Sequence, residues 1–410
     1  MRKKVVALAV AGVFAAPAVV LAQSSTVQIY GRITYEYGYA NQPDPAPGFE
    51  SPSTDYADSP GGSAIGFRGE EKLGGGLSAW FQCESSADVR GMDQTGLCTR
   101  NSAVGFKGGW GNLHFGRWDT PFKRALNMGS VGAEETGILG MSFLPWGGSG
   151  GADATSSADS AQRQRWKRRE AGLTYYESPK FGGFQILAAF SSGNSGADNA
   201  PFTAGQQNQK PRVISLGGTY SAGPLALGIG YEVHQDFGFY APTAAVTGQS
   251  ADDKAWALAA SYTFAGKIEV GATYLDAKYE TNPALGQELK KKTATIGVDW
   301  SIAGPHGVEA MYAWADDSSG NATSGIGGNG GSAAPVQAGV CGGALASCAT
   351  GGDAFSIAYR YRFSKRTRIK LGYVSVSPDA NTNTYRIGNV PAGAPGEDSD
   401  AFAFHIQHNF

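Results

Sequence analysis

The sequence is poor in several features that support helical or disulfide-rich folds. Among its 410 residues are only 4 cysteines and 5 methionines. Beyond the first residues no run reaches the roughly eighteen apolar residues that a transmembrane helix needs, so a helical membrane protein is excluded. Its 60 glycines disfavour helices, whereas 20 phenylalanines and 18 tyrosines suit pleated surfaces. The composition therefore favours β structure.

The N-terminus reads as a secretory signal. MRKKVVALAVAGVFAAPAVVLA, residues 1–22, has three basic residues, an apolar run and small or aliphatic residues before Ala22. Pro17 and the small-residue ending favour cleavage over a membrane-spanning helix, so Gln23 is expected to begin the mature chain. Removing three of the 33 Lys and Arg leaves 30 against 35 Asp and Glu, a net charge near −5. No linker is evident, and residues 23–410 are predicted to form a single domain.

The C-terminus, AFAFHIQHNF, alternates apolar with mostly polar residues. This two-residue period predicts a strand with one apolar and one polar face. The same period recurs in short segments along the mature chain, which predict sixteen strands near 27–39, 63–70, 77–84, 99–108, 111–118, 166–178, 182–193, 211–221, 224–235, 253–265, 267–280, 290–302, 306–316, 352–364, 366–377 and 401–410.

The connectors between these strands alternate in length. Brief turns such as AGK at 265 join the strands within a pair, whereas long polar connectors such as 40–60, 119–165 and 317–351 separate the pairs. An exported chain of this kind is either a soluble β protein or an outer-membrane barrel. The even strand number and the segregation of short and long connectors favour an all-β, sixteen-stranded antiparallel transmembrane barrel over a sandwich. Its last strand would close the cylinder against the first, with Phe410 at the water interface.

Several stretches resemble the general diffusion porins of Gram-negative outer membranes, particularly the β-proteobacterial type. They are VQIYGRITYEYG, SAIGFRGEEKLGGGLSAWFQCE, RNSAVGFKGGWGNLHFGRWDTPF, YYESPKFGGF, AFSIAYRYRFSKRTRIKLGYV and a terminal phenylalanine. The resemblance covers nearly the whole mature chain in order. It implies a homotrimer in the outer membrane, through which ions and small hydrophilic solutes diffuse. It also implies that Phe410 belongs to an assembly signal and that the third external loop, about Asp119 to Arg165, folds inward.

The resemblance further implies a charged constriction, with basic side chains on one wall facing carboxylates on the loop. Arg117 matches one wall arginine, and Arg168 or Arg169 another. Ala64 replaces an arginine that the family often carries. Arg32, Arg68 and Arg100 are candidate substitutes: the first two lie on the polar faces of their strands, whereas Arg100 has the parity of Val104 and Phe106 and needs a bulge to point inward. The available loop carboxylates are Asp119, Glu134 and Glu135.

The cluster RQRWKRRE, residues 163–170, allows two interpretations. It is either a solvated external run that contacts lipopolysaccharide phosphates, or part of a channel entrance that attracts anions. The second interpretation predicts an anion preference, because the local field at the narrowing decides selectivity. No cofactor and no nucleic-acid partner are expected.

The cysteines predict two disulfides in an oxidising compartment. We favour the pairs Cys83–Cys98 and Cys341–Cys348 over free thiols or a metal site, since no Cys-x-x-Cys spacing supports zinc. His306 and His405 are expected at turns or on the surface, and His114 in the channel.

Four functions compete. The leading one is a general porin, and a porin selective for one solute at the third loop is the alternative. A barrel enzyme is remote, because the five scattered histidines show no catalytic spacing. A surface adhesin or receptor would bind through its Gly- and Ser-rich loops, and its activity would survive closure of the pore.

Overall fold

The structure is a computed structural model that describes residues 26–44, 48–59, 62–91, 96–132, 137–140, 166–191, 212–240, 249–282, 285–322, 349–382, 385, 387, 390 and 393–410. Within them, sixteen long strands and two short ones form one sheet. No helix among the described residues is long and apolar enough to cross a membrane.

The long strands have the following bounds: β1 Thr26–Asn41, β3 Ala64–Gly74, β4 Leu77–Ser86, β5 Ser102–Gly108, β6 Gly111–Asp119, β7 Arg169–Glu177, β8 Phe184–Ser191, β9 Arg212–Ala222, β10 Leu225–Tyr240, β11 Gln249–Phe264, β12 Ile268–Asn282, β13 Gln287–Ala303, β14 His306–Ala315, β16 Gly352–Arg362, β17 Thr367–Pro378 and β18 Ser399–Asn409. The short elements are β2 Thr54–Asp58, β15 Ser319–Gly320 and the helix α2 Pro121–Leu126. The sixteen predicted strands are therefore confirmed, with ends shifted by a few residues.

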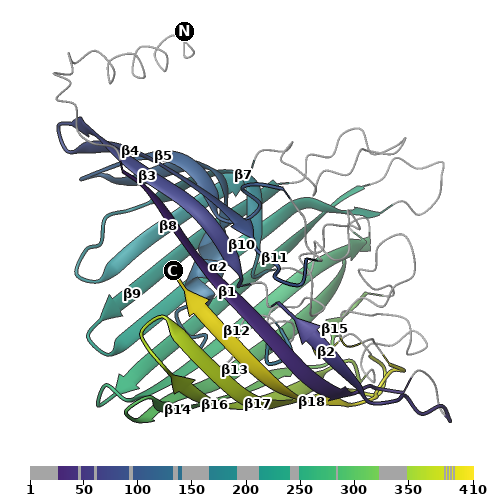
Figure 1. The fold of residues 1–410 in the computed structure, drawn as a ribbon. Helices are drawn as coiled ribbons and strands as arrows, with labels where there is room; N and C mark the ends of the chain where they lie inside the picture. Colours follow the sequence, from purple (N-terminus) through teal and green to yellow (C-terminus); the bar gives the residue numbers. More distant parts are fainter. Residues whose placement is uncertain are drawn as a thin grey trace.

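The sheet closes on itself. Each long strand pairs antiparallel with the next, and β18 pairs with β1 in a register that joins Arg32 to Asn409 and Asn41 to Asp400. Figure 1 shows the strands as the wall of a cylinder, with short turns gathered on its left. At the turn between β3 and β4, Gly75 and Gly76 have φ of +59° and +79°, a region in which L side chains are strained. Closure leaves no strand edge unpaired in lipid.

The alternation of exposure identifies the two faces of the wall. Val27 and Ile29 are 62% and 61% exposed, whereas Thr34 and Glu36 on the other alternation of β1 are buried. On β18, Phe402, Phe404 and Ile406 are exposed and the residues between them are buried. We call the face that carries the exposed apolar residues the outer face, and the face that carries the buried residues the inner face.

None of the three short elements was predicted, and β15 lies in the expected connector 317–351. The connector expected at 40–60 contains β2. This strand pairs with Glu36–Ala40 in the second half of β1, whereas β3 pairs with Thr26–Arg32 in the first half. The long connector 119–165 begins with α2. Both β2 and α2 lie where glycine, proline and small polar residues obscure any period, so local sequence carried little signal.

Candidate functional site

The inner face of the barrel is lined by small side chains over much of its circumference. Ala255, Ala257 and Ala277 are buried, whereas Trp256 and Leu258 on the outer face of β11 are 40% and 45% exposed. Small inward residues leave space within the cylinder for another part of the chain. The beginning of the predicted third loop occupies that space.

Helix α2 packs against the inner face of β9, β10 and β11. Thr120 caps its N-terminus by accepting from the N–H of Lys123, and the Phe122 N–H donates to Ser215 Oγ at 3.0 Å. The approach is close, since a Cβ added at Gly217 would lie 2.7 Å from the Pro121 carbonyl oxygen. Glycine on the inner face therefore allows the helix to lie flat on the wall.

The described residues after α2 follow the wall further. Val131 lies where side chains on Gly271 and Gly297 would stand, and Leu139 contacts the position of Gly372 on β17. Ile138 and Leu139 join a buried cluster with inner residues of β14 to β18. The described part of 119–165 thus runs along the inside of the barrel from β9 to β18; the rest of this segment lies outside the described residues.

Glu36 joins this segment to the barrel seam. Its Oε2 accepts from the Ile138 N–H at 2.6 Å, and its Oε1 lies 2.8 Å from His405 Nδ1 on β18. His405 is fully buried, so its expected place at a turn or on the surface was wrong. The strand alternation places it inward, opposite Glu36. His114, expected in the channel, is on the inner alternation of β6 and fully buried.

Two of the predicted arginines lie on the inner alternation of neighbouring strands. Arg32 Nε donates to the Gly62 carbonyl oxygen at 2.8 Å. Arg68 Nε donates to Gln28 Oε1 at 3.0 Å, and its guanidinium lies 4.9 Å from the centre of the Tyr30 ring. Arg68 is exposed and forms no ion pair with the residues that the structure describes. Its charge therefore acts on the water of the channel.

The arginines at the start of β7, Arg168 and Arg169, are paired with acids. Arg168 Nη2 lies 2.5 Å from Glu170 Oε2, and both side chains are buried. Arg169 Nη2 lies 3.3 Å from Asp119 Oδ1, and Lys123 Nζ lies 3.1 Å from the same oxygen. Asp119 is thus held between two cations.

Arg117 is placed differently from the prediction. It pairs in register with Ser102 and shares the alternation of the exposed Phe115, not that of the buried His114, beside a register shift between β6 and β7 at Gly116 and Trp118. That is the outer face, so strand parity does not bring Arg117 into the channel. Glu134 and Glu135, the other predicted loop acids, lie outside the described residues.

Sequence reasoning missed a group of charges on the last strands. Arg360 Nη1 lies 2.5 Å from both Asp299 Oδ2 and Glu309 Oε1, and Lys370 Nζ lies 2.5 Å from Glu309 Oε2. The bonded partners are 51 to 61 positions apart in sequence and meet only across β13, β14, β16 and β17. Their two-residue alternation with exposed tyrosines and leucines was the one local signal that could have indicated their inward direction.

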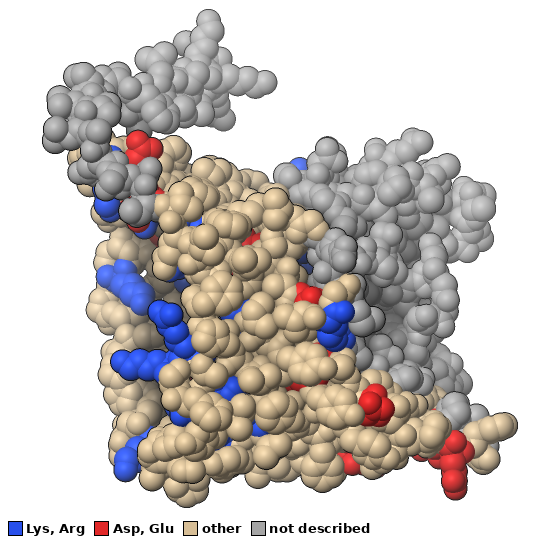
Figure 2. All heavy atoms as spheres, viewed as in Figure 1, with Lys and Arg blue, Asp and Glu red and all other residues tan. Residues whose placement is uncertain are grey.

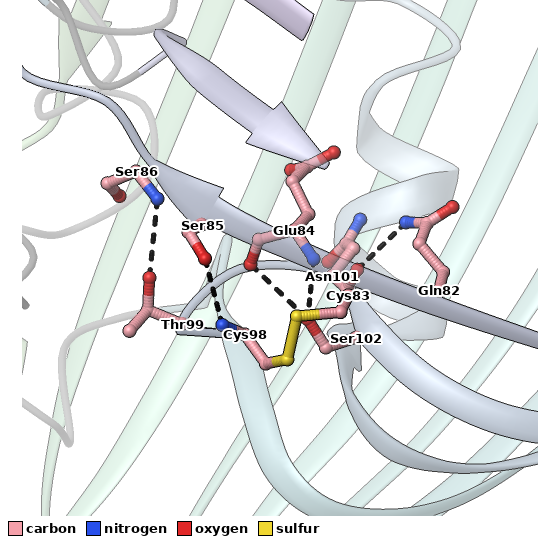
Figure 3. Close-up of a disulfide and its surroundings, with 9 residues drawn as sticks. All are labelled: Gln82, Cys83, Glu84, Ser85, Ser86, Cys98, Thr99, Asn101 and Ser102. Carbon is pink, nitrogen blue, oxygen red and sulfur yellow. Dashed lines mark hydrogen bonds between the residues drawn. A yellow bond between two sulfur atoms is a disulfide. The ribbon is translucent and has the colours of Figure 1, made fainter. Parts of the chain in front are cut away.

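A disulfide joins Cys83 and Cys98, as predicted, with their Cα atoms 4.6 Å apart. Figure 3 shows it between β4 and the segment that leads into β5, flanked by a hydrogen bond from the Cys98 N–H to Ser85 Oγ at 2.9 Å. Cys341 and Cys348 lie outside the described residues. Among the described side chains, no group of three or more His, Cys, Asp or Glu is placed to hold a metal ion.

The family model and the curated relatives that match this chain agree on one family. Residues 7–381 match the family model described as Gram-negative porin. Outer membrane porin protein 32 of Delftia acidovorans is 28% identical over 318 residues, which are 77% of this chain and 80% of that protein. The major outer membrane protein P.IB of Neisseria gonorrhoeae is 30% identical over 214 residues, 51% of this chain and 54% of that protein.

Solved structures share the fold. An anion-selective porin from Comamonas acidovorans superposes with a TM-score of 0.66 at 22% identity and covers 94% of this chain and 100% of that one. OmpT of Vibrio cholerae superposes with a TM-score of 0.58 at 15% identity and covers 95% of this chain and 99% of that one.

Proposed function

Because this chain belongs to the Gram-negative porin family and lies in the outer membrane, we propose that the channel through its barrel prefers anions. The protein forms a water-filled pore for passive diffusion of ions and small hydrophilic solutes. A closed wall of sixteen strands is wide enough for an aqueous lumen. The segment 120–140, where described, lies inside that lumen and reduces its cross-section.

The observation that carries the anion preference is the position of Arg68. Its charge faces the lumen, is exposed, and has no carboxylate within ion-pair distance among the described residues. Arg32 lies on the adjacent strand with the same inward alternation. Fixed charges in a narrow pore with low-dielectric walls raise the local concentration of the opposite ion. The anion selectivity of the Comamonas acidovorans porin, which shares this fold, agrees with this preference.

The test is the zero-current potential in a planar bilayer that separates two concentrations of KCl. The native protein should give the sign of a chloride-preferring pore. Arg68→Gln, and more strongly the double variant with Arg32→Gln, should shift this potential toward zero. Arg117→Gln serves as the matched control and should leave it unchanged, because Arg117 lies on the outer alternation. An unaltered potential in the double variant would show that other groups set the selectivity.

We also propose how the chain is processed and assembled. Residues 1–22 are removed on export, residues 23–410 fold as one barrel domain, and three copies assemble in contact with outer-membrane lipid and lipopolysaccharide. The predicted constriction would then include Glu134 and Glu135 opposite the basic wall. Mass spectrometry of the purified protein should find Gln23 at the N-terminus. Electrophoresis without heating should show a band of three times the mass of the boiled chain, and a monomer band alone would refute the trimer.

We propose, finally, that the protein is a channel and not an enzyme. Diffusion of a solute through a porin channel requires no covalent bond to be made or broken. Purified protein should pass small sugars into liposomes at rates that depend on their size, without altering them chemically. Chemical conversion of a solute during passage would contradict this.

A further inference from the structure

A row of aromatic side chains crosses the inner face of β4, β6 and β7. The register places Trp80 opposite Gly105, Gly105 opposite His114, and His114 opposite Tyr175. Residues directly opposite share a face of the sheet, and the buried His114 and Tyr175 show that this face is the inner one. A Cβ at Gly105 would lie 2.5 Å from the Cβ of His114. Glycine on β5 therefore lets the rings of Trp80 and His114 meet, with 5.3 Å between their centroids.

Trp118 adds a second indole to this row. Its ring centroid lies 5.0 Å from that of His114 and 5.8 Å from that of Trp80. Tyr175 stacks on His114 with 4.7 Å between centroids. We call Trp80, His114, Trp118 and Tyr175 the aromatic patch. His114 and Tyr175 are fully buried, whereas Trp80 and Trp118 are half-buried, so the two indoles are the part of the patch that stays open to the lumen.

The indole of Trp80 has its polar atom already bonded. Its Nε1–H donates to Asn112 Oδ1 at 2.8 Å, which orients the ring on the wall. The surface that Trp80 still exposes is therefore mainly carbon, and removing such surface from water is favourable. Aromatic rings also attract one another in offset or edge-to-face arrangements. The patch is thus suited to a solute with a flat apolar ring.

A cation lies beside the patch. Glu70 is directly opposite Trp80 in the register of β3 and β4, and Arg68 lies two residues along β3 on the same face. Diagonal neighbours of this kind are about 7–8 Å apart. Arg68 Nε donates to Gln28 Oε1, and its guanidinium lies over the Tyr30 ring. Its two Nη groups form no hydrogen bond or ion pair with the residues that the structure describes, so they can bind an anion from the lumen.

Two carboxylates on the same face of β3 and β4 are already held by cations. Glu70 lies 2.6 Å from Lys72 Nζ through one oxygen and 2.6 Å from Lys107 Nζ through the other. Glu84 Oε1 lies 2.8 Å from Arg100 Nε. Neither acid depends on Arg68 for compensation, and the charge of Arg68 stays available.

The outer surface that Figure 2 shows offers a charged solute little. Most of that surface is uncharged, and Lys and Arg gather along the left edge of the view, the end at which the short turns lie in Figure 1. Exposed rings of this face, such as Phe402 and Phe404 on β18, meet lipid. Inside the barrel, by contrast, Arg68 and Trp80 lie on one wall, so a solute that crosses the lumen meets an aromatic ring and a cation together.

We propose that Trp80, Trp118 and Arg68 form a binding site for a small aromatic carboxylate inside the pore. The ring of the ligand packs on the two indoles, and its carboxylate accepts hydrogen bonds from the Nη groups of Arg68, because a guanidinium fork matches the geometry of a carboxylate. One benzene ring with an attached carboxylate spans the diagonal from Trp80 to Arg68. The site names a solute class for the proposed pore and rests on its water-filled, anion-preferring lumen.

The experiment measures chloride current through single channels in dilute KCl, where charges are weakly screened. Benzoate is the probe. Acetate carries the same charge without the ring, and benzamide carries the ring without the charge. Native protein should show a saturable fall in current with benzoate at concentrations at which acetate and benzamide leave the current unchanged. Equal inhibition by benzoate and acetate would overturn the aromatic site.

Substitutions then separate the ring from the charge. Trp80→Leu should weaken inhibition by benzoate about fivefold, the size of one aromatic contact. Trp80→Phe keeps a ring and should stay within about twofold of the native inhibition constant. Arg68→Gln should weaken the inhibition about tenfold, as expected for the loss of a charge-assisted hydrogen bond.

The matched control is Trp256→Leu, the same substitution at a tryptophan on the outer face of β11. It should leave the inhibition constant unchanged. Normal conductance in KCl alone establishes that a variant has folded, and if Trp80→Leu does not conduct, the comparison of benzoate with acetate on the native protein decides. Equal losses in Trp80→Leu and Trp256→Leu would overturn the site.

The outcomes separate this site from the proposed function. Trp80→Leu should keep the native zero-current potential in a KCl gradient, because Arg68 is still present. A native protein that prefers chloride, but whose current benzoate does not reduce, overturns the binding site and leaves the anion-preferring pore standing. A native protein that forms no conducting channel overturns the pore and the site together.

Discussion

Phe410 closes the barrel through its backbone as well as its ring. Its N–H donates to the Gly31 carbonyl oxygen at 3.0 Å, and the Gly31 N–H donates back to Phe410 at 3.2 Å. A Cβ at Gly31 would overlap the Phe410 ring, so glycine at that position lets the ring lie over the first strand. The last residue thus completes the seam between β1 and β18.

Deleting Phe410 should lower the yield of folded barrel in the outer membrane. Two backbone hydrogen bonds are lost at the seam, worth about 1 kcal/mol each, so the first and last strands lose their terminal pairing. Phe402→Ala is the control, because it removes an exposed ring from the same strand but no backbone bond at the seam. The measurement is the fraction of heat-modifiable protein in outer-membrane extracts. Equal yields for the deletion and the native chain would contradict the role of Phe410.

Single residues also show where sequence reasoning reached its limit. The directions of Arg32 and Arg68 followed from strand parity, which local sequence supplies. The ion pair of Arg360 with Glu309 did not, because parity says which face a side chain takes and nothing of its partner across the sheet. The inward position of His405 was missed for a related reason: its partner Glu36, with which it forms a buried pair, comes from the other end of the chain.

At the scale of elements, the strands were predictable and the parts that fill the lumen were not. Two-residue alternation is a local signal, and each strand shows it over about ten residues. Helix α2 spans six residues, too few to show a helical period, and its place depends on Gly217 and Gly228, which lie about a hundred residues away. Its Thr120 cap and Pro121 were the available start signal.

Substitutions of the neighbouring glycines Gly217 and Gly218 on β9 should have different effects, because one faces α2 inside the barrel and the other faces outward. Gly217→Val places a methyl group against the backbone of Pro121, which cannot yield, and should displace α2 toward the channel axis. We expect lower single-channel conductance and a loss of stability of about 1–3 kcal/mol from overpacking.

Gly218→Val is the control for the same strand, since its Cβ would meet Ile229 at 3.2 Å on the outer face and would not touch α2. It should conduct as the native protein does. A native conductance in Gly217→Val would mean that α2 does not lie against the wall in the membrane.

The segment after β4 is held to β2 by Arg90. Its guanidinium lies 2.7 Å from Asp88 Oδ2 and 3.2 Å from Asp58 Oδ1, and it donates to the Ala57 carbonyl oxygen at 3.0 Å. Hydrogen bonding to Arg90 lowers the pKa of Asp88 below its usual range. A lowered folded-state pKa means that the contact stabilises the loop above the ordinary aspartate pKa, and that this contribution is lost as the pH falls through the folded value.

Pepsin should therefore cut this segment of the native protein only under strongly acidic conditions. Arg90→Gln should be cut there at every pH at which pepsin is active, since the contact is absent at any pH. Lys72→Gln, which removes an exposed ion pair on β3, is the control and should behave as the native protein does. The cleavage sites are read by mass spectrometry. Identical pH profiles for the native chain and Arg90→Gln would refute the contribution of this contact.

At the scale of the whole molecule, one arrangement accounts for composition, strand pattern and charge. Alternate residues face lipid, so mean hydropathy stays at −0.24 although the outer face is apolar. The inner face carries small residues under the inserted segment and charged residues elsewhere. A cylinder of this kind holds water inside and lipid outside, and selectivity then depends on which inward charges remain uncompensated.

The most direct test of this arrangement is the current through the purified protein in a planar bilayer. A water-filled pore should produce discrete steps whose conductance rises in proportion to the conductivity of the bathing salt. It should conduct large hydrated ions as well as chloride, with smaller currents as ion size grows. A protein that inserts with native β structure but gives no steps, or whose conductance is independent of salt concentration, would contradict the account.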